Sequence, residues 1–148
     1  MGGHFMPEAD DYAAILSTLA RYSTALDQRD WALLDDVFTE DLVYDAGEWI
    51  TRSRAEYVER LRPYLEGCGS TQHLLGNYRI EIDGDDAQSA VYVRAFHVGS
   101  RELSKSTYEM FGEYRDQLRR TEAGWRSRHR SLRLHHEMGT RDVLRPAG

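Results

Sequence analysis

The 148-residue sequence has little cysteine, lysine and proline, and it contains no long apolar run. Its one cysteine, Cys68, cannot form an internal disulfide, so we expect a reducing, cytoplasmic location. No stretch reaches the roughly 18 consecutive apolar residues that a membrane span needs, and the first residues lack the apolar core of a signal peptide. The sequence therefore predicts neither a membrane segment nor secretion.

The charge balance is acidic, with 25 Asp and Glu against 19 Lys and Arg and a formal net charge of −6. Nucleic-acid binding needs a concentrated cationic face, so we expect no nucleic-acid partner. Arginines do cluster between Arg115 and Arg133, but aromatic residues do not interleave with them as in RNA-binding motifs. The simpler interpretation is a strand face that is solvated or paired with acids.

Helical periodicity is confined to the first half of the chain. Apolar residues recur at steps of three and four over 10–27, which predicts an amphipathic helix. Asp30 can cap a second, short helix that continues to Phe38, and 54–65 reads as a third helix. The segment 39–41 between them reads as a turn, followed by a short strand over 42–45.

The second half is strand-like, with long strands expected at about 71–83, 87–99, 104–120 and 124–135. The turns between them are too short for the crossover connections of parallel strands, so these strands must be antiparallel. Helices followed by a meander are typical of an α+β fold in which a curved sheet packs on helices. We expect one domain over 1–148, with poorly ordered ends at 1–8 and 140–148.

Strand parity brings two histidines to one face of this sheet. His97 shares its face with Val91, Val93 and Ala95, and on the preceding strand His73 shares its face with Leu75 and Asn77. A histidine on an apolar face is compatible with a core role as well as with catalysis. Parity alone therefore predicts their position and leaves their role open.

Asp27 is unusual because it ends the first predicted helix, where the helix dipole disfavours a carboxylate. Another group should therefore stabilise it there. Asp27 can be a solvated turn residue or a local partner of Arg29. Alternatively, it points inward and orients an imidazole, fixing its tautomer and raising its basicity.

Three strings decide between these interpretations: Tyr22 to Trp31, Thr71-Gln72-His73, and Ala95-Phe96-His97. In order and spacing they resemble the SnoaL-like branch of the nuclear-transport-factor-2-like (NTF2-like) superfamily, with the scytalone dehydratases and bile-acid 7α-dehydratases as the nearest members. The resemblance runs from about 10 to 133. It implies a cone in which three N-terminal helices pack on a strongly curved, mostly antiparallel sheet around a pocket.

The resemblance also implies a metal-free and cofactor-free elimination of water. Carried over by motif, Asp27, His73 and His97 are the catalytic groups and Tyr22 is a pocket tyrosine that stabilises the enolate. Two histidines and a carboxylate could instead bind iron as a facial triad, but no local ligand spacing supports a metal site. Removal of an α-proton and protonation of the departing hydroxide suit histidines on chemical grounds.

We therefore predict a small lyase, a dehydratase for a hydrophobic, carbonyl-containing substrate of polyketide or steroid type. The alternatives are a polyketide cyclase or isomerase with the same pocket, and a non-catalytic ligand-binding or dimerisation module. A homodimer or homotrimer is expected. The candidate substrate-contacting residues are Tyr44, Trp49, Asn77, Phe111, His129 and Arg133.

Overall fold

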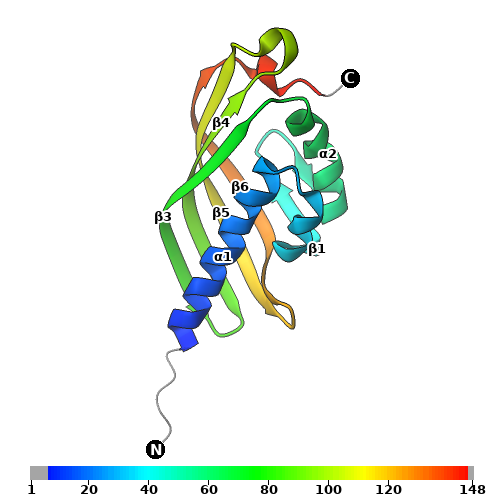
Figure 1. The fold of residues 1–148 in the computed structure, drawn as a ribbon. Coiled ribbons are helices and arrows are strands. Elements are labelled where there is room, and N and C mark those ends of the chain that lie inside the picture. The colour runs from blue at the N-terminus through cyan, green and yellow to red at the C-terminus, as the bar shows by residue number, and fades with distance from the viewer. Residues whose placement is uncertain (1–6, 147–148) are drawn as a thin grey trace, which may run out of the picture.

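The computed structural model describes residues 7–146, so part of the expectation for each chain end lies outside the described residues. Helix α1 (Pro7–Asp27) is long, η1 (Trp31–Asp36) is a 3-10 helix, and α2 (Arg54–Glu66) lies beside η1 (Figure 1). The Asp30 side chain caps η1 by accepting the Leu33 N–H, as the sequence predicts. Two shorter 3-10 helices follow, η2 (Arg101–Leu103) and η3 (Arg141–Leu144).

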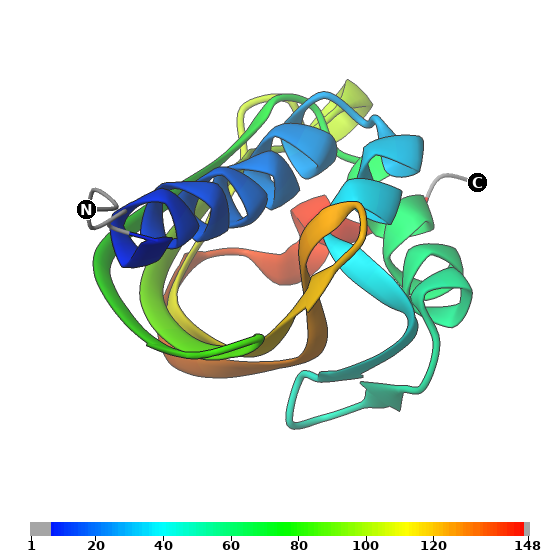
Figure 2. The ribbon, with the colours of Figure 1, turned by 90° about the horizontal axis from the view of Figure 1, so that it is seen from below.

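The remaining elements form one six-stranded sheet in the order β2-β1-β6-β5-β4-β3. All neighbours are antiparallel except β1 and β6, which are parallel. The sheet curls beneath α1 without closing into a barrel (Figure 2). The predicted α+β class and the mostly antiparallel sheet are confirmed. The strands are β1 (Phe38–Asp45), β2 (Ile50–Thr51), β3 (Thr71–Asp83), β4 (Asp86–Val98), β5 (Thr107–Thr121) and β6 (Gly124–Gly139).

The core lies between α1 and the concave face of the sheet. The predicted apolar stripe of α1 is buried there, with Ile15, Leu19 and Leu26 at most 1% exposed. The inward positions of β4, Val91 and Val93, pack into the same cluster. Burial of this stripe, rather than intrinsic helix propensity, supplies most of the stability of such a helix. Its last two turns are therefore held firmly against the sheet.

Two bulges change which side chains face the concave side. In β3 the register shifts between Gly76 and Arg79, so Asn77 takes a left-handed backbone with φ +48° and its side chain is exposed. In β6 the register shifts around Arg128, because Ser127 pairs with Leu118 whereas His129 pairs with Gln117. A bulge inserts one unpaired residue and exchanges the faces beyond it. Past this point Arg130 and Leu132, rather than His129, point inward.

Several expectations about element boundaries are wrong. Strand β1 already begins at Phe38, where a helix and then a turn were expected, because Val37 accepts the Ser127 N–H and brings this segment to β6. The hairpin strand β2 was not expected, and the second helix is of the 3-10 type. The C-terminal segment forms η3 with Val143 only 2% exposed, whereas a poorly ordered end was predicted from 140 onward.

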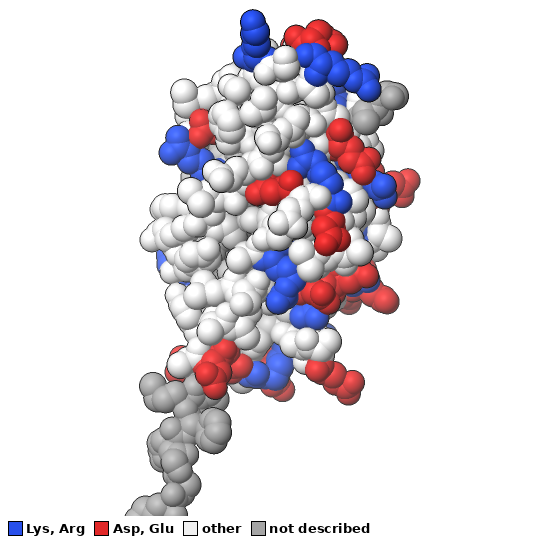
Figure 3. Space-filling model, in the orientation of Figure 1, with Lys and Arg blue, Asp and Glu red and all other residues white. Residues whose placement is uncertain are grey.

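The surface charges are largely paired. In the arginine-rich segment, Arg115 pairs with Glu113, Arg120 with Asp11 and Arg126 with Asp36. Figure 3 shows acidic and basic side chains interspersed over the face that carries α2 and η1. Pairing with acids is therefore the better interpretation of most of this segment. Within the part of the chain that the structure describes, no helix has the length and apolar character to cross a membrane.

Candidate active site

A cavity of about 540 Å³ lies between the C-terminal half of α1, helix α2 and the concave face of the sheet. Side chains from α1, α2, η3 and five of the six strands line it. Tyr22, His73 and His97 are on its wall, together with apolar residues such as Leu26, Met110 and Leu132. A largely apolar pocket with a few convergent polar groups is the usual form of a small-molecule site.

Asp27 and His73 form a hydrogen-bonded pair at this cavity. Asp27 Oδ1 lies 2.7 Å from His73 Nδ1, and Asp27 Oδ2 accepts the His73 backbone N–H at 2.9 Å. An ionised carboxylate can only accept, so Nδ1 carries the proton and Nε2 of His73 keeps its lone pair. Burial acts to raise the pKa of the Asp27 carboxyl, but hydrogen bonds from His73 and Thr71 outweigh it and lower that pKa.

His97 lies close to His73 but is held differently. The two rings are 5.6 Å apart between centroids in an edge-to-face arrangement, and His97 Nδ1 lies 3.1 Å from the Tyr108 carbonyl oxygen. Because a carbonyl oxygen only accepts, Nδ1 of His97 is the donor and Nε2 is the free acceptor. Burial, followed by the charge of His73, lowers the pKa of His97 to about 4. His97 is therefore neutral near pH 7.

Tyrosines form the floor of the cavity. The hydroxyls of Tyr22 and Tyr57 lie 2.6 Å apart, and Tyr44 stacks on Tyr57 with 4.4 Å between ring centroids. Trp49 lies near both of these rings, with its ring centroid 5.4 Å from that of Tyr44 and 6.4 Å from that of Tyr57. Burial raises the pKa of Tyr22 and of Tyr44 well above the ordinary value, so both phenols stay protonated. They can donate hydrogen bonds to a bound oxygen.

A buried guanidinium lies beneath these tyrosines. Arg130 is fully buried, and its Nε donates to both oxygens of Asp116 at 3.0 and 2.9 Å. Its Cζ lies 4.3 Å from the ring centroids of both Tyr22 and Tyr114. Among the described residues, Nη1 and Nη2 have no hydrogen-bond partner. The site thus contains a cation that faces aromatic rings and stabilises negative charge developing near Tyr22.

The structure brings six of the ten predicted site residues together. Tyr22, Tyr44, Trp49, His73 and His97 line the cavity, and Asp27 supports it from behind His73. Tyr44 therefore reaches the pocket, a position that the sequence left open.

Four predicted substrate contacts lie elsewhere. Phe111 is on the convex face, where the Arg94 guanidinium covers its ring. Asn77 is exposed within the bulge in β3, and Arg133 is exposed beyond the bulge in β6. His129 is also displaced from the inward face, since the parity that it shares with Trp125 ends at Arg128. Among the described residues, none of these four lines the cavity. The structure therefore does not place them where a substrate contact was expected.

Sequence reasoning missed Arg130, Tyr114 and Thr71. Arg130 stood in a run of arginines that reads as a charged surface, and only the bulge turns it inward. Tyr114 shares its strand face with Asp116 and Leu118, and all three are buried. Alternation along β5 therefore was a signal in the sequence that Tyr114 faces inward. Thr71 lies two residues before His73, so alternation places both side chains on the same face of the strand. This shared face was the signal in the sequence that Thr71 could contact Asp27.

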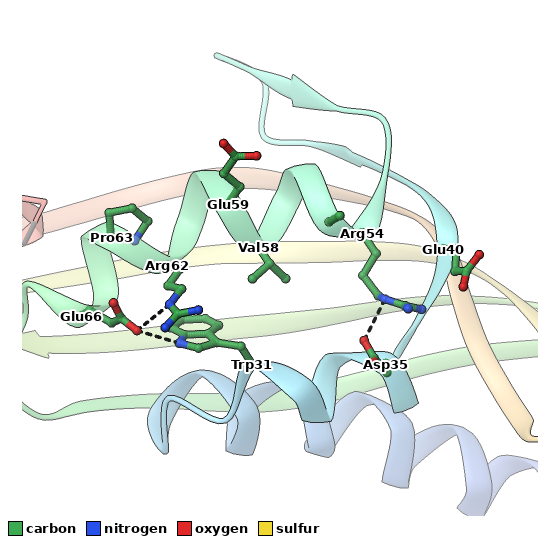
Figure 4. A pocket seen from close by; sticks show the side chains of 10 residues that line it. Trp31, Asp35, Glu40, Arg54, Val58, Glu59, Arg62, Pro63 and Glu66 are labelled. Atoms are coloured by element: carbon green, nitrogen blue, oxygen red, sulfur yellow. Dashed lines mark hydrogen bonds and ion pairs between the residues drawn. The ribbon is translucent and has the colours of Figure 1, made fainter.

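A second hollow lies between α2 and η1 (Figure 4). It is larger, about 890 Å³, but none of the predicted catalytic residues lines it. Five of its polar side chains are paired with each other: Arg62 and Trp31 both donate to Glu66, and Arg54 pairs with Asp35 at 3.0 Å. The tyrosine-lined cavity is therefore the better candidate for an active site, because the Asp27–His73 pair adjoins it.

The donor set of the cavity does not suit a metal ion. Asp27 Oδ1 and His73 Nδ1 are bonded to each other, and His97 Nδ1 is bonded to a carbonyl. Two Nε2 atoms remain, fewer than the three protein ligands of a catalytic zinc or facial-triad iron site. Within residues 7–146, no group of three or more His, Cys, Asp or Glu side chains is arranged to hold a metal.

The low pKa of His97 predicts a specific pH dependence of stability. Between pH 6.5 and about 4 the unfolded chain binds a proton that the folded chain excludes. The contribution of His97 to the free energy of unfolding is therefore complete above pH 6.5, and it is lost as the pH falls through this window. At pH 4.5 the loss amounts to about 2.5 kcal/mol relative to pH 7.

Urea unfolding of the native chain and of His97→Gln at pH 7 and pH 4.5 measures this loss. The variant should lose about 2.5 kcal/mol less on acidification, and the exposed control His135→Gln should behave like the native chain. The Asp27 carboxyl does not disturb this comparison, because its pKa is lowered from the ordinary 3.8 and its contribution to stability is lost only below that pH. An equal pH dependence in the native chain and His97→Gln would contradict a neutral, buried His97.

Comparison with known proteins links this geometry to one family. The family model of the SnoaL-like domain matches residues 7–131. An uncharacterized protein of Mycobacterium tuberculosis is 36% identical over 86 residues, a match that covers 57% of this chain and 58% of the relative. The chain thus spans less than two thirds of the length of the curated relatives that it matches.

Three solved structures have a similar fold. A candidate aromatic ring hydroxylase from Novosphingobium aromaticivorans is 27% identical, with a TM-score of 0.82 over 93% of this chain and 98% of that chain. A candidate scytalone dehydratase from the same organism is 23% identical, with a TM-score of 0.78 over 90% and 89%. A hexachlorocyclohexane dehydrochlorinase from Novosphingobium barchaimii is 13% identical, with a TM-score of 0.78 over 90% and 92%.

Proposed function

The chain belongs to the SnoaL-like domain family and has its NTF2-like fold, and from this premise we propose that it is a small lyase that eliminates water from a hydrophobic β-hydroxy carbonyl compound. The observation that carries the proposal is the 2.7 Å contact between Asp27 and His73 at the tyrosine-lined cavity. It leaves Nε2 of His73 as a base in contact with the cavity.

The neighbours differ in their named chemistry, since one is called a hydroxylase, one a dehydratase and one a dehydrochlorinase. Fold likeness alone therefore does not select a reaction. Two of the three names describe an elimination that begins with loss of a proton from carbon. A carboxylate-oriented imidazole in an apolar cavity suits that step, which favours a lyase.

In the proposed reaction, Nε2 of His73 removes the proton next to the substrate carbonyl. The electron pair of that C–H bond forms an enolate, whose oxygen accepts hydrogen bonds from Tyr22 and Tyr44. Arg130 beneath the Tyr22 ring stabilises the same negative charge. Collapse of the enolate forms the C=C bond and breaks the C–O bond at the β-carbon.

The proton then returns from the His73 imidazolium to the departing hydroxide, so that water leaves and His73 is ready for another cycle. His97 is unsuited to this donation, because its one N–H is bonded to the Tyr108 carbonyl and its pKa is low. Its free Nε2 instead accepts a hydrogen bond from the substrate hydroxyl and orients it. The sequence left open which histidine is the acid, and these contacts support a mechanism in which His73 carries out both proton transfers.

The cavity favours a flat, mostly apolar substrate. The parallel rings of Tyr44 and Trp49 offer a planar wall, and Leu26, Met110 and Leu132 complete the apolar surface. A volume of about 540 Å³ accommodates a fused-ring compound of two to four rings. Substrates of polyketide or steroid type fit this description.

A bicyclic β-hydroxy ketone, 3-hydroxy-1-tetralone, tests the proposal, because loss of water yields fluorescent 1-naphthol. We expect the native chain to form 1-naphthol at least 10²-fold faster than the uncatalysed solution, the smallest gain typical of one positioned proton transfer. Incubation of 1-tetralone in D₂O separates the steps, since proton removal alone exchanges the α-hydrogen for deuterium.

The outcomes distinguish the alternatives. Exchange without dehydration would favour an isomerase or cyclase that uses the same base. Binding of 1-naphthol, seen as quenching of the tryptophan fluorescence of the chain, without exchange or dehydration would favour a non-catalytic ligand-binding module. Neither binding nor exchange with a panel of such ketones would contradict the proposed substrate class.

A further inference from the structure

Arg29 sits immediately after α1 and ties together three segments around Asp27. Its guanidinium donates to the carbonyl oxygens of Leu26 at 2.8 Å, Leu65 at 2.9 Å and Gly69 at 2.8 Å. These carbonyls belong to the end of α1, the end of α2 and the approach to β3. The carbonyl end of a helix favours a cation, and Arg29 supplies one to two helices at once.

The backbone of Arg29 is unusual as well. Its φ of +56° places it in the left-handed region, where glycine is the common residue after a helix. A residue with a side chain is less stable than glycine in that conformation, because its Cβ crowds the backbone. Such a conformation persists only where surrounding contacts hold it, and it clusters at functional sites. The side-chain contacts of Arg29 hold it in this position.

The contact that matters for the active site is the one with Thr71. Arg29 Nη1 donates to Thr71 Oγ1 at 2.7 Å, and Thr71 Oγ1 in turn donates to Asp27 Oδ1 at 3.0 Å. A guanidinium cannot accept and a hydroxyl has only one proton, so the Thr71 proton must point at Asp27. The chain of hydrogen bonds from Arg29 through Thr71 to Asp27 therefore has a single direction.

This direction fixes the state of Asp27. Oδ1 receives protons from Thr71 and from His73 Nδ1, and Oδ2 receives the His73 backbone N–H. Three donors stabilise the carboxylate at the end of a helix that would otherwise disfavour it. The cation of Arg29 opposes the same helix-end dipole. An anionic Asp27 can only accept from His73, which excludes the tautomer with hydrogen on Nε2.

We propose that Arg29 is a positioning residue for the reaction, acting through Thr71 and Asp27 to keep Nε2 of His73 unprotonated and available as the base. The inference rests on the proposed function only in taking Nε2 of His73 as the group that removes a proton from the substrate. It assigns a catalytic consequence to Arg29 and Thr71, which do not line the cavity.

Nuclear magnetic resonance of the isotope-labelled full chain tests the inference without any substrate. The ¹⁵N shifts of the His73 ring near pH 8 report its tautomer, and the ¹³Cγ shift of Asp27 reports its titration midpoint. In Arg29→Met and in Thr71→Val we expect the midpoint of Asp27 to rise by about 1. Asp27 stays ionised near pH 8 in these variants, but a carboxylate that Thr71 no longer orients leaves Nδ1 of His73 for part of the time. We therefore also expect a measurable population of His73 with hydrogen on Nε2, which the native chain lacks.

Two further variants separate positioning from simple structural support. Arg29→Lys keeps the cation and should restore part of the native tautomer population. Arg21→Met removes an arginine contact from α1 to a backbone carbonyl, that of Asp36, and should change neither signal. Thr71→Val leaves the carbonyl contacts of Arg29 in place, so it decides the question even if Arg29→Met fails to fold.

The inference is overturned if folded Thr71→Val keeps the native tautomer and the native midpoint of Asp27. It is also overturned if Arg29→Met lowers the melting temperature but leaves both signals unchanged. The variants can give the expected NMR shifts while the native chain turns over no hydroxy ketone. That result would reject the proposed function and leave intact the inference about the hydrogen bonds from Arg29 through Thr71 to Asp27. The two failures are therefore distinguishable.

Discussion

Replacement of Asp27 by asparagine is expected to lower the rate of 1-naphthol formation by about 10³–10⁴-fold. Asparagine can present its N–H₂ group to Nδ1 of His73, which then becomes an acceptor and moves the ring proton to Nε2. The lone pair that faces the cavity is lost although the shape of the site is kept. In serine proteases, a comparable carboxylate-to-amide change costs about 10⁴-fold by the same wrong-tautomer effect.

The matched control for this change is Asp30→Asn, three residues further on. Asp30 caps η1 by accepting the Leu33 N–H, and asparagine caps about equally well, so activity should stay within about twofold of the native value. Thermal unfolding of both variants checks that folding is intact. Turnover by Asp27→Asn within tenfold of the native rate would show that Asp27 does not orient the catalytic base.

Replacement of Asp116 by asparagine is expected to lower the free energy of unfolding by about 3–5 kcal/mol. Asp116 is 3% exposed and Arg130 is fully buried, and both carboxylate oxygens accept from Arg130 Nε. Without the carboxylate the guanidinium is left as an uncompensated charge in the core, where burial of a cation is costly. Urea unfolding at pH 7 measures the difference.

Two comparisons make this result specific. Glu109→Gln breaks the more exposed pair with Arg94 on the convex face and should cost at most about 1 kcal/mol. The double variant Asp116→Leu with Arg130→Met removes both charges and should recover most of the stability that Asp116→Asn loses. A loss below 1 kcal/mol in Asp116→Asn would mean that water or another group solvates Arg130 in the folded chain.

The sequence contained most of what places the catalytic pair. The apolar stripe of α1 fixes the direction in which the helix ends, and Asp27 follows directly on that stripe. In the β3–β4 pair, His97 is opposite Thr71 and His73 is opposite Ala95. The two histidines are therefore diagonal neighbours on one face, and simple alternation brings their rings together. The family resemblance then selected these three residues from other polar groups of similar parity.

The errors have a common physical cause, which is that alternation does not reveal bulges. Asn77 and His129 were assigned to the concave face by counting in twos from His73 and Trp125, but Asn77 lies within a bulge and His129 lies just beyond one. Arg130 was hidden by the same counting. Nothing in local hydrophobicity marks Arg128 as the unpaired residue, because its neighbours are also polar or charged.

The end of the chain was misjudged for a different reason. The segment after 140 is short and polar, and it carries one apolar anchor, Val143. The Val143 carbonyl accepts the Cys68 thiol at 3.1 Å, a contact between positions 75 residues apart. Tertiary contacts of this kind override weak local propensity, and they are invisible to a window of a few residues.

The bulge at Arg128 also has a consequence for how the family can diverge. In β6 a single inserted residue decides whether the guanidinium at 130 points into the core or into solvent. Loss or gain of one residue between Trp125 and Arg130 would exchange the two faces of the strand beyond it, even with every flanking residue unchanged. The number of residues in this segment therefore sets the direction of the Arg130 side chain as directly as the identity of those residues does.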